Sequence, residues 1–194
     1  MRRSERRVPF AVGFTKGSGA GVVSLTVPGS LQYRDVAVRV VGAACKLFSR
    51  GTSDSTPPGA PAENAPVDQR TNDFADEMVS QVVSAFSEAF NNLALHGYKG
   101  VTPGDIEIRV DSVNEPSHVD SEGRTVDGGQ VIVVEITDTG RVFDPANHMD
   151  LPEEEPERGM GLFIIRSFMD EVGYVAGPPN VLTLKKRLRK VPRG

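Results

Sequence analysis

The sequence lacks the features that would tie a chain together covalently or anchor it in a membrane. Cys45 is its single cysteine, which excludes an intramolecular disulfide framework. No apolar run approaches the roughly 20 residues that a helix needs to cross a bilayer. Positive charge is not in excess, since 22 Lys and Arg against 26 Asp and Glu give a formal net charge of -4. We therefore expect no membrane partner and no direct nucleic-acid partner, because either would require a local basic patch.

The N-terminus carries no convincing secretion signal. The segment MRRSERRVPFAVGF is basic, but its apolar part is short and broken, and Gly-rich sequence follows where a signal peptide would be cleaved. We expect a cytoplasmic protein. Cys45 lies in the apolar stretch AVRVVGAACKLF, which predicts a small, inert core residue.

The chain is long enough for one domain with extensions. It has 194 residues, of which 38% are hydrophobic and 25% charged, a balance that can bury a core. We expect a flexible basic and Gly-rich extension at 1–21, a domain at 22–188 and a basic tail at 189–194. A Pro-, Ala-, Ser- and Gly-rich stretch at about 50–68 is expected to be a disordered insertion in that domain.

Hydrophobic periodicity predicts about three helices and about five strands. The helices are expected at 35–49, 72–96 and 160–170, and the strands at 22–29, 105–110, 130–137, 172–177 and 181–188. In the first helix the spacing predicts a buried face of Val36, Val40, Val41, Ala44, Leu47 and Phe48. The order of elements favours an α/β protein of the α+β sandwich kind, a mixed β-sheet covered on one face by helices.

The helix expected at 72–96 carries two polar side chains opposite its apolar stripe. Glu88 and Asn92 are four residues apart, so they stack on one face, away from Val83 and Phe90. Oxygen ligands of this kind suit Mg²⁺, and a Glu beside the metal can accept a hydroxyl proton. The alternative is an ordinary solvated helix face.

Two further motifs follow along the chain. Asp138 and Gly140 come directly after the apolar strand VIVVEIT, where a carboxylate can accept a hydrogen bond from an exocyclic amino group such as that of adenine. The segment 158–162, RGMGL, places two glycines at a helix start, where backbone N–H groups can bind phosphate and Arg158 can pair with it. Taken alone, the first motif can be a plain turn and the second a flexible helix start.

Together the three motifs resemble the GHKL ATPases with the Bergerat fold. The resemblance is closest to the RsbW-like anti-sigma-factor serine/threonine kinases. It rests on SEAFNNLALHGY (87–98), ITDTGRVFDP (136–145) and ERGMGLFIIRSFMDEVGY (157–174), and spans most of 24–188. It implies ATP and Mg²⁺ as cofactors. It assigns the proton-accepting or orienting role to Glu88, the metal to Asn92, and the adenine to Asp138 and Gly140. Asn91 and His96 are expected to be structural. The remaining cofactor-binding residues would be Arg158, Gly159, Met160, Gly161 and Leu162.

The sequence departs from the family pattern at two motifs and in the length of the stretch at 50–68, which is longer than the family would imply. Val142 replaces a second glycine, and Pro178-Pro179-Asn180-Val181 stands where the last motif has a Gly-Thr pair. The resemblance implies an anti-sigma factor that phosphorylates a STAS-type anti-anti-sigma protein and sequesters a sigma factor, as a homodimer. The departures leave open an ATP-binding module without phosphoryl transfer. A third hypothesis, a nucleic-acid adaptor, rests on the terminus KKRLRKVPRG, which is otherwise a solvated edge strand and tail.

Overall fold

The computed structural model describes residues 11–15, 22–50, 69–119, 123, 125–126, 128–142 and 160–188. The chain forms, in order, β1 (Ala11–Thr15), β2 (Val22–Pro28), the 3-10 turn η1 (Leu31–Tyr33), α1 (Arg34–Arg50), α2 (Gln69–Asn92), the π turn η2 (Leu93–Gly97), β3 (Asp105–Glu115), β4 (His118–Val119), β5 (Thr125–Val126), β6 (Gly129–Asp138), α3 (Met160–Phe168), β7 (Glu171–Val175) and β8 (Asn180–Arg187). None of the described helices is long and apolar enough to pass through a membrane.

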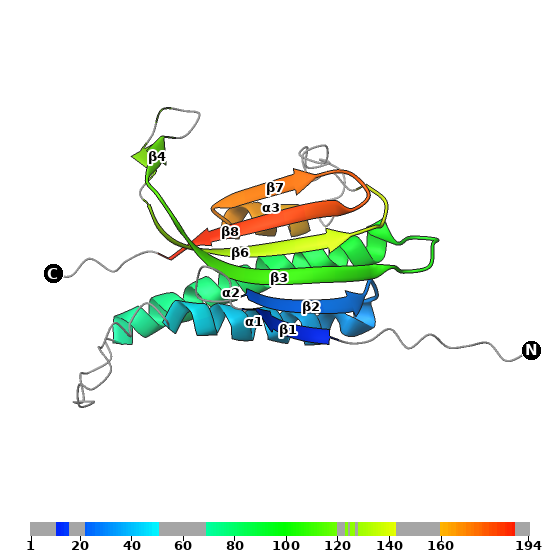
Figure 1. Cartoon of the computed structure of the whole chain (residues 1–194), viewed down its shortest axis with the longest axis horizontal. Coiled ribbons are helices and arrows are strands. Elements are labelled where there is room, and N and C mark those ends of the chain that lie inside the picture. The colour runs from blue at the N-terminus through cyan, green and yellow to red at the C-terminus, as the bar shows by residue number, and fades with distance from the viewer. Residues whose placement is uncertain are drawn as a thin grey trace, which may run out of the picture.

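Among the described residues, the main sheet has six strands in the order β1-β2-β3-β6-β8-β7, and β4 and β5 form a small separate hairpin (Figure 1). The expected α+β architecture is confirmed, but the expectation of a mixed sheet is wrong, because every described pair of neighbours is antiparallel. Two helices separate β2 from β3, so β3 returns in the opposite direction. The helix α3 between β6 and β7 lets these two strands run in the same direction. They are not neighbours, because β8 lies between them and is antiparallel to both. Since β7 is the edge strand, the expectation that β8 would be an edge strand is also wrong.

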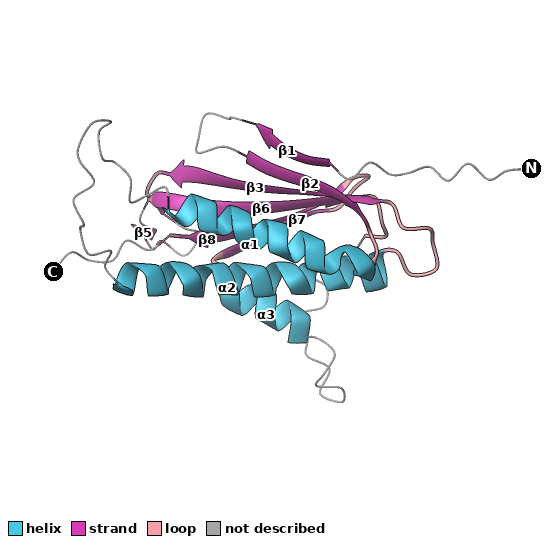
Figure 2. Ribbon diagram, turned by 90° about the horizontal axis from the view of Figure 1, so that it is seen from below, coloured by secondary structure: helices cyan, strands magenta, loops and turns pink. Residues whose placement is uncertain are grey.

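The three helices cover one face of the sheet (Figure 2). Arg34 at the start of α1 donates a hydrogen bond from Nη2 to the Ser87 Oγ late in α2. Further along α1, Gly42 lies against Val83, so the two helices run antiparallel. α3 packs on the other side of α2. The polar face of α2 is therefore next to α3 rather than in open solvent.

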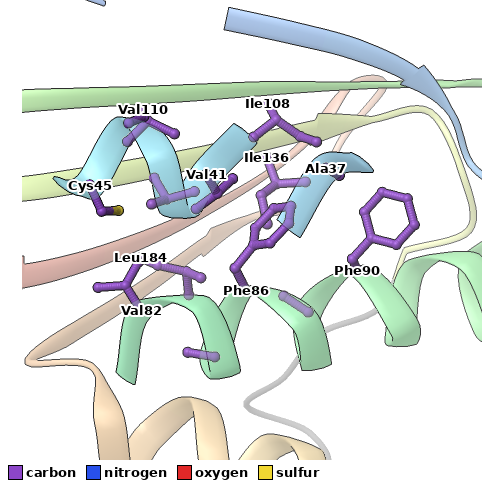
Figure 3. Close-up of a cluster of buried hydrophobic side chains, with 14 of the residues drawn as sticks. Ala37, Val41, Cys45, Val82, Phe86, Phe90, Ile108, Val110, Ile136 and Leu184 are labelled. Atoms are coloured by element: carbon purple, nitrogen blue, oxygen red, sulfur yellow. The ribbon is translucent and has the colours of Figure 1, made fainter. Parts of the chain in front are cut away.

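The core fills the space between the helices and the sheet (Figure 3). Val82, Phe86 and Phe90 of α2 are fully buried against sheet residues such as Ile108 and Ile136. Side chains of β3 alternate between exposed and buried from Asp105 onward, because successive residues of a strand face opposite sides. This one-sided core leaves the ends of the strands and of α2 to form a site.

The buried face of α1 overlaps most of the expected one. Val41, Ala44 and Phe48 are buried as expected, and so is Cys45. Val36 and Leu47 are exposed instead, and Ala37 is buried. Apolar residues surround this helix, so the spacing admits more than one stripe, and packing on α2 and the sheet selects among them. Burial raises the pKa of Cys45 to about 12, which agrees with an inert core thiol.

The expected N-terminal extension is described in part, whereas nearly all of the expected insertion and the whole expected C-terminal tail are not. Residues 11–15, expected within a flexible extension, form β1, which pairs with β2 from Ala11–Thr26 to Thr15–Val22. Arg50 ends α1, and residues 51–68 of the expected insertion lie outside the described residues. The expected tail at 189–194 lies outside them as well.

Candidate functional site

The start of α3 lies against the polar face of α2. A Cβ atom on Gly161 would be 2.9 Å from the Glu88 Oε2 and 3.7 Å from the Asn92 Nδ2. Glu88 and Asn92 are both half-buried. These three residues, called here the α2–α3 cluster, come from two motifs about 70 residues apart that the fold brings together.

Asn92 has a polar atom without a partner. Its Nδ2 is buried and makes no hydrogen bond among the described residues. Leaving a buried polar group unpaired costs about 1–3 kcal/mol, so such a group in a cleft points to a ligand. Rotation of the amide by half a turn would offer Oδ1 at the same place, and an amide oxygen is a ligand that Mg²⁺ accepts.

Asp138 is the last residue of β6, and its side chain is only 3% exposed. Its Oδ1 accepts hydrogen bonds from the Gly140 N–H at 2.7 Å and the Asn180 Nδ2 at 3.2 Å. No donor among the described residues reaches Oδ2. Burial raises the pKa of Asp138, and the two hydrogen bonds oppose that rise. The carboxylate therefore offers one free acceptor oxygen in a desolvated place.

Asn180 is a residue that the sequence motifs missed. It is fully buried, and besides Asp138 its Nδ2 donates to the Gly140 carbonyl oxygen at 3.1 Å. It lies directly opposite Asp138 in the pairing of β6 with β8. That register is the signal that identifies it, and the register depends on the folded sheet. Asp138, Gly140 and Asn180 are called here the strand-end cluster.

The η2 turn connects the two clusters. The Arg141 N–H donates to the Gly97 carbonyl oxygen at 2.9 Å, and a Cβ atom on Gly140 would also be 2.9 Å from that oxygen. η2 continues directly from Asn92 at the end of α2. The close approach of two backbones explains why glycine stands at position 140. His96 is exposed in the same turn and contacts neither cluster through a described hydrogen bond.

Two hollows flank these clusters. A small, mostly apolar cavity of about 20 Å³ lies between α2, α3, β7 and β8. A wider hollow of about 340 Å³ lies beside Gly140. The two share no lining residue. The first is lined by Ala89, Asn92, Leu93, Leu162, Ile165, Arg166, Val172, Tyr174 and Leu182, and the second by Tyr98, Val101, Thr102, Gly104, Thr139, Gly140 and Arg141.

Of the other expected site residues, some are described near the site and some lie outside the described residues. Leu162 lines the small cavity, whereas Met160 is 54% exposed. Arg158 and Gly159 lie outside the described residues, so their expected contacts with phosphate are not placed. Asn91 is half-buried next to Asn92.

The described residues fit a nucleotide carried with a divalent cation. The unpaired amide of Asn92 and the free oxygen of Asp138 are two separate places where polar groups of a ligand would be received. The start of α3 lies directly against Glu88 and Asn92, so its backbone N–H groups are close to the first of these places. The part of the chain that the structure describes holds no group of three or more His, Cys, Asp and Glu side chains placed to bind a metal. Mg²⁺ does not require one, because it usually takes one or two protein oxygens together with phosphate and water.

Comparison with known proteins agrees with this geometry. No curated protein matches the chain. A family profile described as "Histidine kinase-like ATPase domain" matches residues 62–186, which is more than half of the chain and includes α2, β6, α3 and all of β8 but its last residue. The chain therefore belongs to the histidine kinase-like ATPase domain family, of the GHKL type.

Proposed function

We propose that the protein is an ATP-dependent anti-sigma factor that phosphorylates a serine or threonine of a STAS-type anti-anti-sigma protein and sequesters a sigma factor. Family membership supports the ATP-dependent part. The observation that carries the proposal is the position of Glu88, whose Oε2 is next to the glycine at the start of α3. A carboxylate beside a phosphate-binding helix start is where a proton acceptor for an incoming hydroxyl is needed.

Each cluster has a distinct task in this proposal. Asn92 would hold Mg²⁺, and the N–H groups at the start of α3 would bind phosphate. Asp138 would accept a hydrogen bond from the adenine amino group. Glu88 would take the proton of the substrate hydroxyl. The hydroxyl oxygen would then bond to the γ-phosphorus of ATP as the bond to the leaving ADP breaks. Arg158 and Gly159 are expected to add contacts to the terminal phosphates.

Phosphate transfer tests the kinase proposal directly. The protein is incubated with Mg²⁺, γ-labelled ATP and STAS-domain proteins encoded in the same genome, and the label on each STAS protein is measured. Glu88→Ala should lower transfer by at least about a hundredfold, in the range found for general bases. Glu77→Ala, exposed on the same helix, is the matched control and should transfer normally. No transfer by the unaltered protein, or undiminished transfer by Glu88→Ala, would refute the kinase proposal.

A second function, nucleotide-dependent binding without catalysis, is favoured by Pro178-Pro179-Asn180 in place of the Gly-Thr pair. ATP binding in a calorimeter together with no label on any STAS protein would select it. The expected homodimer belongs to both proposals and is measured by sedimentation.

The nucleic-acid hypothesis receives less support than these two. Lys185 pairs with Glu115 and Glu171, and Lys186 pairs with Asp170. Arg187 pairs with Glu115. These cations of the described C-terminal strand are balanced by carboxylates of the chain itself. We propose that the protein contacts no nucleic acid directly, which an electrophoretic mobility assay at low salt would test.

A further inference from the structure

We propose that Asn180 is a positioning residue that sets the base specificity of the site, by holding the Asp138 carboxylate as a pure hydrogen-bond acceptor toward a 6-amino purine. The inference rests on the proposed nucleotide site and adds a residue that lies outside all three motifs. Its support comes from the hydrogen bonds of one fully buried side chain.

The orientation of the Asn180 amide is fixed by its surroundings. The Gly177 N–H donates to the Asn180 Oδ1 at 3.1 Å, and a backbone N–H can only be a donor, so the oxygen must face Gly177. The Nδ2 group then points the other way, to the Asp138 Oδ1 at 3.2 Å and the Gly140 carbonyl oxygen at 3.1 Å. Both hydrogens of Nδ2 therefore have acceptors.

This arrangement determines what Asp138 can do. Two donors converge on Oδ1, so that oxygen has to be an acceptor and Oδ2 remains for a ligand. A carboxylate oxygen pairs with the amino group at position 6 of adenine and opposes the carbonyl oxygen at position 6 of guanine. A protonated Asp138 would instead be able to donate to guanine. Keeping the carboxylate ionised in a buried place is thus the step that selects the base.

Asn180 is one of the two groups that keep Asp138 ionised. Burial raises the pKa of Asp138, whereas the hydrogen bonds from Gly140 and Asn180 lower it. Among the described residues, Tyr98 is a titratable side chain whose pKa the charge of Asp138 affects. Burial and then the Asp138 charge raise the pKa of Tyr98, so it stays neutral from about pH 4 to pH 8. Loss of the Asn180 donor should therefore raise the pKa of Asp138 further.

The test compares two variants of similar shape, Asn180→Thr, which retains a donor, and Asn180→Val, which has none. Both are β-branched and suit a strand, so they differ chiefly in the hydroxyl group. Calorimetry gives the Kd of ATP and of GTP, each with Mg²⁺, from about pH 5 to pH 8. We expect Asn180→Val to bind ATP about tenfold more weakly at neutral pH. It should also bind ATP and GTP with more similar Kd values. As the pH is lowered, it should lose ATP binding at a higher pH than the unaltered protein does. Asn180→Thr should restore much of each property.

A measurement without nucleotide separates this role from a merely structural one. The carboxyl ¹³C shift of Asp138 is followed by NMR as the pH changes, and its midpoint should rise by about one unit in Asn180→Val. Asn114→Ala, exposed on β3, is the control and should change nothing. An unchanged midpoint, or an unchanged ratio of the Kd values for ATP and GTP in Asn180→Val, would overturn the inference alone. Failure of the unaltered protein to bind ATP would instead contradict the nucleotide site itself.

Discussion

Gly161 lies where the start of α3 meets the polar face of α2, and the absence of a side chain allows the close approach of Glu88. A methyl group there would approach the Glu88 Oε2 to 2.9 Å, but that atom is the far end of a flexible side chain that can turn away. Alanine also suits a helix better than glycine by about 0.5–1 kcal/mol. A side chain at position 161 should therefore disturb the position of Glu88 more than it lowers the stability of the fold.

Gly161→Ala should consequently weaken Mg²⁺-ATP binding while leaving stability nearly unchanged. We expect the Kd to rise about tenfold, equivalent to about 1.4 kcal/mol, because the methyl group would displace Glu88 at the start of α3, where the phosphates are proposed to bind. Calorimetry gives the affinity, and denaturant unfolding should show a change of less than about 1 kcal/mol. Gly129→Ala is the control, since a Cβ atom there meets nothing within 4 Å. Normal affinity in Gly161→Ala would mean that phosphate binds elsewhere.

Single residues also show how far the sequence alone could lead. Glu88, Asn92 and Gly161 were identified because their spacing and residue types can be read along the chain, and the structure brings them together. Asn180 stands where the family has its last motif, but its residue type does not match that motif, so its role follows only from the register that places it opposite Asp138. In the same manner, the contact between the Gly97 carbonyl oxygen and the Arg141 N–H follows from tertiary packing and could not be read from the sequence.

At the scale of elements, the helices and strands were predicted well but their faces and neighbours less well. α2 has one clear apolar stripe, so its buried side followed from the sequence. α1 has apolar residues around its circumference, so its buried side followed only in part, with Val36 and Leu47 exposed against expectation. The strand β1 was missed because its five residues lie between basic and Gly-rich residues, which hide its pattern, and its pairing with β2 is visible only in the folded sheet.

An ion-pair cluster joins the end of β3 to β8 across the sheet. The Glu115 Oε1 is 3.0 Å from the Lys185 Nζ, and its Oε2 is 3.0 Å from the Arg187 Nη1. The Glu115 side chain is 20% exposed, so these pairs are only partly screened by solvent. The hydrogen bond from Lys185, with the charges of both cations, holds the pKa of Glu115 below its ordinary value.

The lowered pKa of Glu115 gives a stability difference with a defined pH dependence. A carboxyl group with a lower pKa in the folded state stabilises the fold above its unfolded pKa, and this contribution is lost as the pH falls through the folded pKa. Glu115→Gln should therefore lower the free energy of unfolding by about 1 kcal/mol at pH 7. The difference should shrink below about pH 4. Denaturant unfolding at several pH values measures it, with Glu107→Gln, exposed on the same strand, as control. A difference that persists undiminished at low pH would show that the effect is not electrostatic.

At the scale of the whole molecule, the proposed ligand requires groups from distant parts of the chain. α2, the end of β6, the start of α3 and the start of β8 each supply one part of the two clusters. An unfolded chain cannot present these groups together, so a ligand of the site binds only the folded state. The unpaired Asn92 Nδ2 is a cost to the fold in the absence of ligand. Stability and binding therefore oppose each other at that residue.

Two thermal measurements follow from this opposition. Mg²⁺-ATP at a hundred times its Kd should stabilise the fold by about 2.7 kcal/mol and raise the Tm by about 5–10 °C. Removal of Mg²⁺ with EDTA should reduce that shift, because in the proposed site the metal would link Asn92 to the phosphates. In Asn92→Leu, the ligand-free protein should be at least as stable as the unaltered one, and the part of the shift that depends on Mg²⁺ should disappear. Scanning calorimetry of both proteins, without ligand and with ATP in the presence and absence of EDTA, measures the ligand-free stabilities and the Tm shifts. If Asn92→Leu retains the full shift that depends on Mg²⁺, the metal is held by another group and Asn92 is buried for a different reason.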